Sequence, residues 1–136
     1  MALEAGMWAE TEIVVTDAMT AAAVGSGLVA GLSTPSMIGL MEGAAVKAVS
    51  AHLEAGTSTV GSRIDVAHLA PTPVGMSVRA RAVLDVVEGR RLVFSVSVAD
   101  EVGEVGRGTH ERFVIDLARF AQRMNERLAT GGSEDT

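Results

Sequence analysis

The sequence predicts an α+β domain in which an antiparallel sheet curls around one long helix, and two observations support this. The stretch from Thr34 to about Gly56 is apolar on nearly every helical face, which is typical of a buried helix. From residue 60 onward, apolar and polar residues alternate in four successive runs, as in strands with one buried face. One helix followed by consecutive strands is an α+β pattern, and a helix that is apolar all round needs a sheet wrapped about it.

Length and composition agree with a single globular domain. The chain has 136 residues, of which 48% are hydrophobic and 21% charged. A net charge of −6 is unfavourable for contact with nucleic-acid phosphates, so we expect no such partner. The absence of cysteine excludes disulfides, thiolate nucleophiles and cysteine–zinc sites. The N-terminus shows no signal-peptide pattern and no stretch is a convincing membrane span, so we expect a cytoplasmic protein without a membrane partner.

The helix and the strands each have recognisable boundaries. Thr34 can cap the long helix, Pro35 suits its first turn, and Gly56 is a stop signal. Residues 17–33, rich in Ala and Gly, are expected to be a loop or a short helix. The expected strands are 8–16, 60–70, 76–87, 90–99 and 104–115, with a hairpin turn at Glu88-Gly89.

A short C-terminal helix should follow the last strand. Asp116 caps it, and its apolar stripe is Leu117, Phe120, Ala121, Met124 and Leu128. We expect one domain over residues 1–128 and a disordered tail over 129–136. A sheet wrapped around one long helix in this way is the hotdog fold.

Glu42 is the most informative polar residue because it lies within the apolar helix. Its helical neighbours at i±3 and i±4 include no cation, and an unpaired buried carboxylate is costly. Glu42 is therefore either a catalytic carboxylate in a cleft, a residue at a solvent-facing edge of the helix, or one that bonds across a dimer.

The histidines differ in their surroundings. His68 shares the core-facing side of its strand with Ile64 and Val66, just before a proline-marked strand end, and can be structural or catalytic. We expect His110 to be a structural or supporting residue. His52 lies near a helix C-terminus, where it can interact favourably with the helix dipole. No spacing resembles a metal site, so we expect no metal.

Four segments in order resemble the fluoroacetyl-CoA thioesterase family of hotdog proteins. They are STPSMIGLMEG (33–43), DVAHLAPTPVG (65–75), VEGRRLVFSVS (87–97) and GRGTHERFVIDLARF (106–120). The resemblance implies a homodimer, or a higher oligomer, with the active site at the subunit interface. It implies that Thr34, Glu42 and His68 act together on an acyl-CoA thioester, and that the backbone at Gly61 lies close to the acyl group.

The resemblance also has departures. Leu28, Leu32 and Ser36 stand where the fluoroacetate-specific enzyme has aromatic residues around its substrate, so we expect another small acyl group. Coenzyme A is then part of the substrate and no separate cofactor is needed. Its phosphates require cations, and the candidates are Arg79, Arg81, Arg90, Arg91 and Arg107.

Two routes of hydrolysis and two other functions stay open. Glu42 could attack the thioester carbonyl, or Glu42 or His68 could activate water. A hotdog fold also serves acyl-CoA dehydratases or hydratases, and non-catalytic acyl-CoA-binding proteins.

Overall fold

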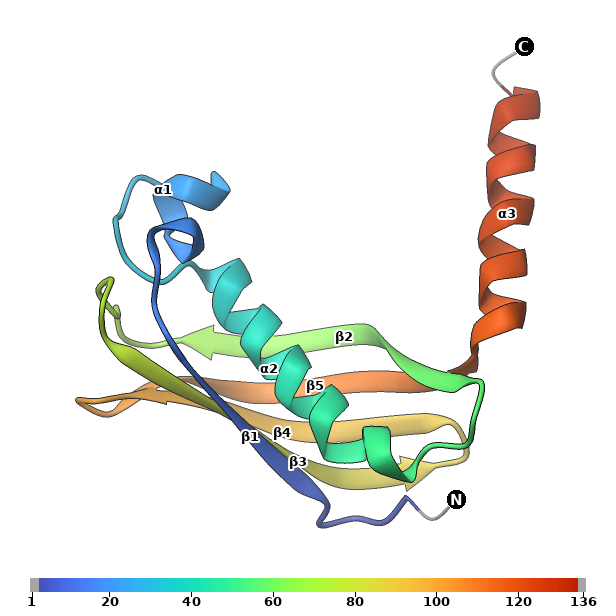
Figure 1. The fold of residues 1–136 in the computed structure, drawn as a ribbon, viewed down its shortest axis with the longest axis horizontal. Coiled ribbons are helices and arrows are strands. Elements are labelled where there is room, and N and C mark those ends of the chain that lie inside the picture. The colour runs from blue at the N-terminus through green and yellow to red at the C-terminus, as the bar shows by residue number, and fades with distance from the viewer. Residues whose placement is uncertain (1–2, 135–136) are drawn as a thin grey trace.

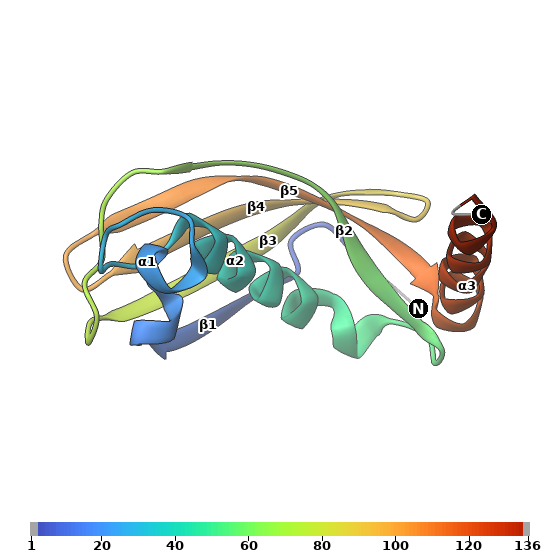
Figure 2. The same cartoon turned by 90° about the horizontal axis from the view of Figure 1, so that it is seen from above.

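The computed structural model describes residues 3–134, with side chains as far as Gly131, and has the predicted arrangement. Five antiparallel strands form one sheet in the order β1-β3-β4-β5-β2. The long helix α2, Thr34–Val49, lies against the concave face of this curved sheet (Figures 1 and 2). The strands are β1 (Trp8–Val14), β2 (Thr57–His68), β3 (Ser77–Glu88), β4 (Arg91–Asp100) and β5 (Glu104–Asp116).

The core forms between α2 and the middle of the sheet. Strands β3 and β4 alternate as predicted and turn one face toward the helix. Burying a side chain of the size of Val, Leu, Met or Phe stabilises the folded state by about 1.5–3 kcal/mol. The buried set includes Met37, Met41, Ala44, Ala45, Ala48 and Val49 from α2, Val78, Ala80, Ala82 and Leu84 from β3, and Leu92, Phe94, Val96 and Val98 from β4.

The opposite side of α2 is open, which corrects the prediction that this helix is buried all round. Val46 is 39% exposed, and a Cβ added at Gly39 or Gly43 would meet no atom within 4 Å. The helix is apolar on both sides, but one chain supplies a sheet for only one of them. The open side is therefore an apolar strip without a partner in the described part of a single chain.

The start of α2 also differs from the prediction. Ser33, not Thr34, is the N-cap, and its Oγ accepts a hydrogen bond from the backbone N–H of Ser36 at 3.1 Å. Thr34 becomes the first helical residue. Its hydroxyl is therefore not used by the cap and is available to another partner.

Strand β2 contains a bulge that the alternation did not reveal. Gly61 pairs with Arg112 and Arg63 with Glu111, so Ser62 is an extra residue in the ladder. The bulge reverses which positions face α2. Even positions face the helix only after the bulge, so a simple alternation along the strand would wrongly place Val60 and Ser62 on the face of His68.

The segment before α2 folds as short helices, one of the two outcomes expected for residues 17–33. It contains η1, Asp17–Met19, and α1, Ala21–Val24. Isolated bridges join Thr20 to Leu32 and Gly31 to Pro73, which hold the segment over the N-terminal end of α2. A further short helix, η2 (Ser50–His52), follows α2.

The C-terminal helix α3, Leu117–Glu134, is longer than predicted. Asp116 caps it as expected, since its Oδ1 accepts from the backbone N–H of Arg119 at 3.0 Å. The helix includes residues 129–134 of the expected tail, while 135–136 lie outside the described residues. α3 leaves the end of β5 and projects past the β2 edge (Figure 1), with Leu117, Met124 and Leu128 more than half exposed. No described helix combines the length and apolarity needed to cross a membrane.

Candidate active site

Thr34 and His68 form the first half of the candidate site. The Thr34 hydroxyl and His68 Nδ1 lie 2.7 Å apart, within hydrogen-bonding distance. His68 is the last residue of β2 and pairs with Gly106 of β5. A Cβ at Gly106 would lie 2.5 Å from the Met37 sulfur, so glycine permits the close approach of the α2 N-terminus to the sheet. This approach brings Thr34 within reach of His68.

The other ring nitrogen of His68 is the unusual atom of this half. His68 Nε2 is buried and has no hydrogen-bond partner among the described residues. Buried polar atoms normally have one, so this nitrogen is free to exchange a proton with a bound molecule. The His68 side chain also lines a hollow, together with Ala21, Val29, Gly31, Leu32, Leu69, Ala70 and Pro71.

Glu42 belongs to a second half of the site, and it is not the unpaired carboxylate that the helix pattern suggested. Its Oε2 lies 3.6 Å from Nη1 of Arg112, which β5 presents to the helix. The Glu42 side chain is 44% exposed and that of Arg112 only 7%. Burial lowers the pKa of the Arg112 guanidinium, and the charge of Glu42 opposes this shift.

Arg112 is held by a buried network. Its Nε donates to the Thr59 hydroxyl and its Nη2 to the Thr59 carbonyl, each at 2.8 Å. Its Nη1 lies 3.1 Å from His110 Nε2, and His110 Nδ1 lies 2.8 Å from the Arg63 carbonyl. A carbonyl only accepts, so His110 donates from Nδ1 and accepts from Arg112 at Nε2. His110 is thus a positioning residue for Arg112.

Sequence reasoning missed Arg112 as a functional residue. The available signal was the alternation of β5, which places Arg112 on the same face as Gly106, Gly108 and His110. An arginine on the core face of a central strand needs a buried partner. The helix pattern could not supply that partner, because Glu42 is about seventy residues away in the sequence.

Gly61 closes this second half from the side of β2. A Cβ at Gly61 would lie 3.0 Å from Glu42 Oε2, 3.2 Å from the His110 ring and 3.4 Å from Arg112 Nη1. A Cβ at this position would push against all three side chains, so glycine leaves them room to keep this arrangement.

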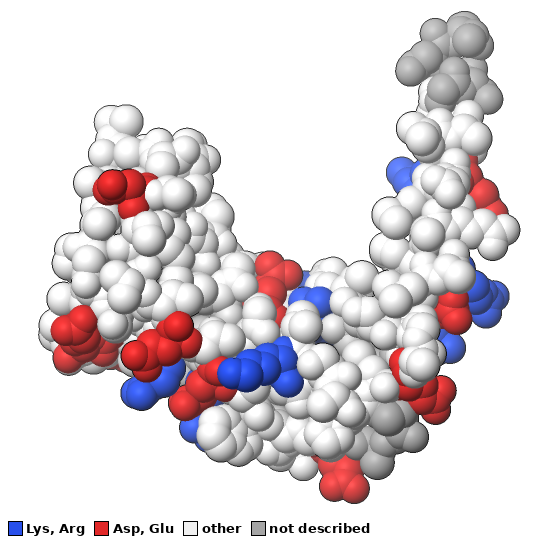
Figure 3. Space-filling view, in the orientation of Figure 1, with Lys and Arg blue, Asp and Glu red and all other residues white. Residues whose placement is uncertain are grey.

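The two halves are separated along α2. Thr34 and Glu42 are eight residues apart, which is about 12 Å of helix rise. One chain therefore joins Thr34 to His68 and Glu42 to Arg112, but does not bring the predicted trio to one point. Figure 3 shows a notch between the α1 lobe and the α3 arm, with acidic and basic groups at its floor.

The predicted substrate residues take different positions. Leu32 is buried and lines the hollow beside His68, whereas Leu28 is 98% exposed and does not line it. Ser36 is used at the helix cap. Val29, which the sequence did not single out, lines the hollow beside Leu32.

Most of the predicted phosphate-binding arginines already have carboxylate partners. Arg79 and Arg81 lie 3.8 Å and 3.5 Å from Glu10. Arg91 lies 2.7 Å from both Glu88 and Glu111, and Arg107 lies 2.8 Å from Glu104. Arg90 is the one predicted cation without an ion pair in the described part of the chain. Within residues 3–134, no group of three His, Asp or Glu side chains could hold a metal ion.

Comparison with known proteins identifies the family. The profile of the fluoroacetyl-CoA-specific thioesterase family matches residues 15–118. The chain belongs to this family. A curated fluoroacetyl-CoA thioesterase of Streptantibioticus cattleyicolor is 46% identical over 99 residues, which cover 73% of this chain and 71% of that protein.

Solved structures agree with this assignment. The structure of a fluoroacetyl-CoA thioesterase is 36% identical, covers 93% of this chain and 98% of its own, and superposes with a TM-score of 0.88. A thioesterase superfamily member from Thermus thermophilus is 32% identical, with coverages of 95% and 98% and a TM-score of 0.84. A hot-dog-like protein from Thermanaerovibrio acidaminovorans is 30% identical, with coverages of 90% and 91% and a TM-score of 0.83. The predicted family and hotdog fold are confirmed.

Proposed function

We propose that this protein hydrolyses the CoA thioester of a small acyl group to the free acid and CoA. Membership in the family makes the chain an acyl-CoA thioesterase. The relative's structures include variants with bound fluoroacetate and with bound acetyl-CoA, both of which carry two-carbon acyl groups. The hollow at His68 is lined mainly by small and aliphatic residues, which suits a short acyl chain.

We propose that the active protein is a homodimer and that each site is composed of both subunits. Three features support this. β2 is an edge strand, α2 has an open apolar side with Gly39 and Gly43, and the two half-sites lie about 12 Å apart along α2. Antiparallel pairing of two β2 edges brings the His68 end of one strand toward the Gly61 end of the other. Glu42 of one chain can then act with Thr34 and His68 of its partner.

The proposed chemistry balances with one water molecule. In the general-base route, Glu42 takes a proton from water as the water oxygen attacks the thioester carbon, and the tetrahedral intermediate then loses CoA thiolate as its carbon–sulfur bond breaks. In the nucleophilic route, Glu42 attacks that carbon itself, the carbon–sulfur bond breaks as the mixed anhydride forms, and water then opens the anhydride. In either route His68 gives a proton to the departing thiolate and regains one that comes from water. Arg112 holds the Glu42 carboxylate in place, and Thr34 orients His68. In this proposal no separate cofactor takes part.

We also propose a cytoplasmic location, because CoA thioesters are made and used there.

A thiol-release assay tests this function. Acetyl-, propionyl-, butyryl-, fluoroacetyl- and the unsaturated crotonyl-CoA are each incubated with the protein, while free thiol and total acyl-CoA are followed together. Hydrolysis releases thiol in step with loss of acyl-CoA. An acyl-CoA hydratase would change an enoyl substrate without releasing thiol, and a binding protein would do neither. Either of these two results would replace the proposal.

A further inference from the structure

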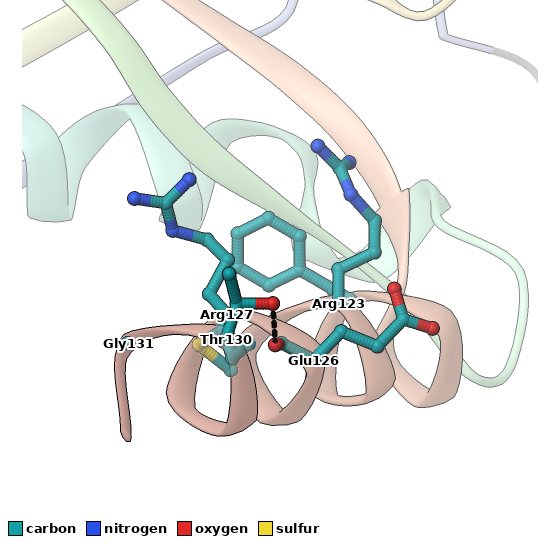
Figure 4. A pocket seen from close by; sticks show the side chains of 7 residues that line it. Arg123, Glu126, Arg127, Thr130 and Gly131 are labelled. Atoms are coloured by element: carbon teal, nitrogen blue, oxygen red, sulfur yellow. Dashed lines mark hydrogen bonds between the residues drawn. The ribbon is translucent and has the colours of Figure 1, made fainter. Parts of the chain in front are cut away.

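A groove with several arginines lies where β5 passes into α3. Phe113 and Phe120 form its apolar part, Arg119 and Arg123 come from the first turns of α3, and Arg90 comes from the β3–β4 turn. A second hollow on α3 shares Phe120 and Arg123 with this groove and adds Arg127. The two hollows therefore adjoin the same two side chains. Figure 4 shows Arg123 and Arg127 extending to the same side of α3, with the Glu126 carboxylate directed elsewhere.

The charge of this groove is opposite to that of the molecule as a whole. The chain has 17 acidic and 11 basic residues, and five arginines elsewhere pair with a carboxylate. Among the described residues, Arg90, Arg119 and Arg123 form no such ion pair. The carboxylate closest in sequence, that of Asp116, accepts from the backbone of Arg119 at the helix cap. Unpaired cations gathered in one place on an acidic protein favour an anionic ligand.

The aromatic rings restrict what kind of anion fits. Phe113 is 36% exposed, and the Arg123 guanidinium lies 6.0 Å from the centre of the Phe120 ring. Guanidinium groups bind phosphate in a bidentate manner, and exposed rings and guanidinium planes stack on a nucleobase. This combination fits a phosphorylated adenosine better than a bare inorganic anion.

The groove is within reach of the candidate active site. Val60 lines the groove and is the neighbour of Gly61, whose backbone approaches Glu42. Asp116, at the other end of the groove, pairs with Thr57, which is four residues or about 13 Å from Gly61 along β2. The pantetheine arm of CoA is long and flexible enough to cover such a distance. The family profile ends at residue 118, so the α3 arginines lie beyond the matched part.

We propose that this groove binds the 3′-phosphorylated adenosine diphosphate end of coenzyme A. The inference rests on the proposed thioesterase function and assigns Arg119 and Arg123 as substrate-binding residues. They bind the part of the substrate that does not react. Their contribution therefore depends on whether the substrate carries the nucleotide.

The test compares two thioesters of the same acyl group. Acetyl-CoA carries the nucleotide, whereas the acetyl thioester of N-acetylcysteamine does not. We expect Arg119→Gln/Arg123→Gln to raise KM for acetyl-CoA by about tenfold or more, since charge-assisted hydrogen bonds are lost. Its kcat/KM for the truncated thioester should stay within about twofold, the variation ordinary for a distant surface change. Lys47→Gln removes a cation that lies against β1, where its Nζ donates to the Glu10 carbonyl at 2.9 Å, so it is the control and should leave both values unchanged.

A direct binding measurement separates this proposal from the thioesterase proposal. Calorimetry with adenosine 3′,5′-bisphosphate should show binding to the parent protein and at least about tenfold weaker binding to the double variant. Binding without hydrolysis of either thioester would retain the groove and overturn the enzymatic function. No binding, or an equal loss on both thioesters, would overturn the groove assignment.

Discussion

At the scale of single residues, the site depends on a carboxylate that is held rather than buried. Glu42 is half exposed in one chain, and its fixed neighbour is Arg112, which Thr59 and His110 lock in place. The cation keeps the carboxylate at one end of the site without closing the solvent side. That open side is where a substrate and a second subunit can approach.

The variant Glu42→Gln tests the role of this carboxylate. Glutamine keeps the size and hydrogen-bonding capacity but is neither a base nor a nucleophile. We expect kcat to fall by about 10²-fold or more, the scale of a lost acid–base or nucleophilic group. Steady-state thiol release measures the loss, and a variant within a few-fold of the parent would remove Glu42 from the chemistry.

Gly61→Ala tests the close approach of β2 to Glu42. The added methyl group would lie 3.0 Å from Glu42 Oε2, so the carboxylate or the strand must shift. A misplaced catalytic group can lower kcat by about 10²-fold while the fold is retained. Gly103→Ala is the control, because its Cβ would meet nothing within 4 Å. Equal activity in the two variants would contradict the argument.

At this scale, contacts were the hardest feature to predict from the sequence. Thr34, Glu42 and His68 were singled out from helix pattern, strand alternation and family resemblance, and two of the three do touch. Their joint catalytic role stays a prediction. Arg112 could not be paired with Glu42, because the partner depends on which strand lies under the helix. The Ser62 bulge was also hidden, since one extra residue in a ladder leaves no local signature here.

At the scale of elements, the segment before α2 is fastened to the sheet at Thr72. The Thr72 carbonyl accepts from the N–H of Leu32 at 2.8 Å, and its hydroxyl donates to Asp100 Oδ2 at 2.8 Å. Burial alone would raise the pKa of Asp100, but the Thr72 hydroxyl and the N–H groups of Val102 and Gly103 together lower it. Leu32, which lines the hollow beside His68, is therefore linked through Thr72 to the ionised carboxylate of Asp100.

The variant Thr72→Val removes the hydrogen bond from the Thr72 hydroxyl to Asp100, and its effect on stability should depend on pH. The variant leaves Asp100 without a buried donor and should lose about 1 kcal/mol of unfolding free energy at pH 7. Because the folded pKa of Asp100 is lowered, its stabilising effect is present above the ordinary value of 3.8 and is lost as pH falls through the folded pKa. The difference between parent and variant in urea unfolding should shrink below that value. A difference that grows on acidification would contradict this sign.

We expect the same segment to influence substrate selection. Leu32 and Val29 line the hollow, and neither has the flat face or polarised edge of an aromatic ring. We expect kcat/KM for fluoroacetyl- and acetyl-CoA to differ by no more than about 10²-fold, because one small substituent in an apolar pocket is worth about 1–3 kcal/mol. Competition between the two thioesters on one preparation measures the ratio. A preference for fluoroacetyl-CoA above about 10³-fold would show that this aliphatic wall is sufficient for selection.

The element boundaries were predicted well where periodicity is strong. Strands β3, β4 and β5 lie close to the expected ranges, because their alternation extends over many residues. Helix α2 begins as expected at Thr34 but ends at Val49, before the predicted stop at Gly56. The Ala- and Gly-rich segment was less clear, since its short helices depend on bridges to Leu32 and Pro73 rather than on local pattern. The full length of α3 was missed because its last turns carry no apolar repeat.

At the scale of the molecule, one chain has two separate half-sites and two uncovered surfaces. These surfaces are the open apolar side of α2 and the unpaired edge of β2. Covering them with a second copy would also bring the half-sites together. One dimeric arrangement would therefore cover the exposed surfaces and also assemble the candidate active site.

We expect the protein to be a dimer in solution. Sedimentation should find no 14.0 kDa monomer at micromolar concentration.

A heterodimer of two inactive variants tests this arrangement most directly. Glu42→Gln and His68→Asn chains carrying different tags are coexpressed, and the mixed dimer is purified through both tags. If each site takes Glu42 from one chain and His68 from its partner, one site in the mixed dimer has both residues intact and the other has neither. The account predicts about half of the parent's thiol-release activity per dimer, since one of two symmetric sites is restored. Activity no higher than that of either variant alone would show that Glu42 and His68 act within one chain, and would contradict the account.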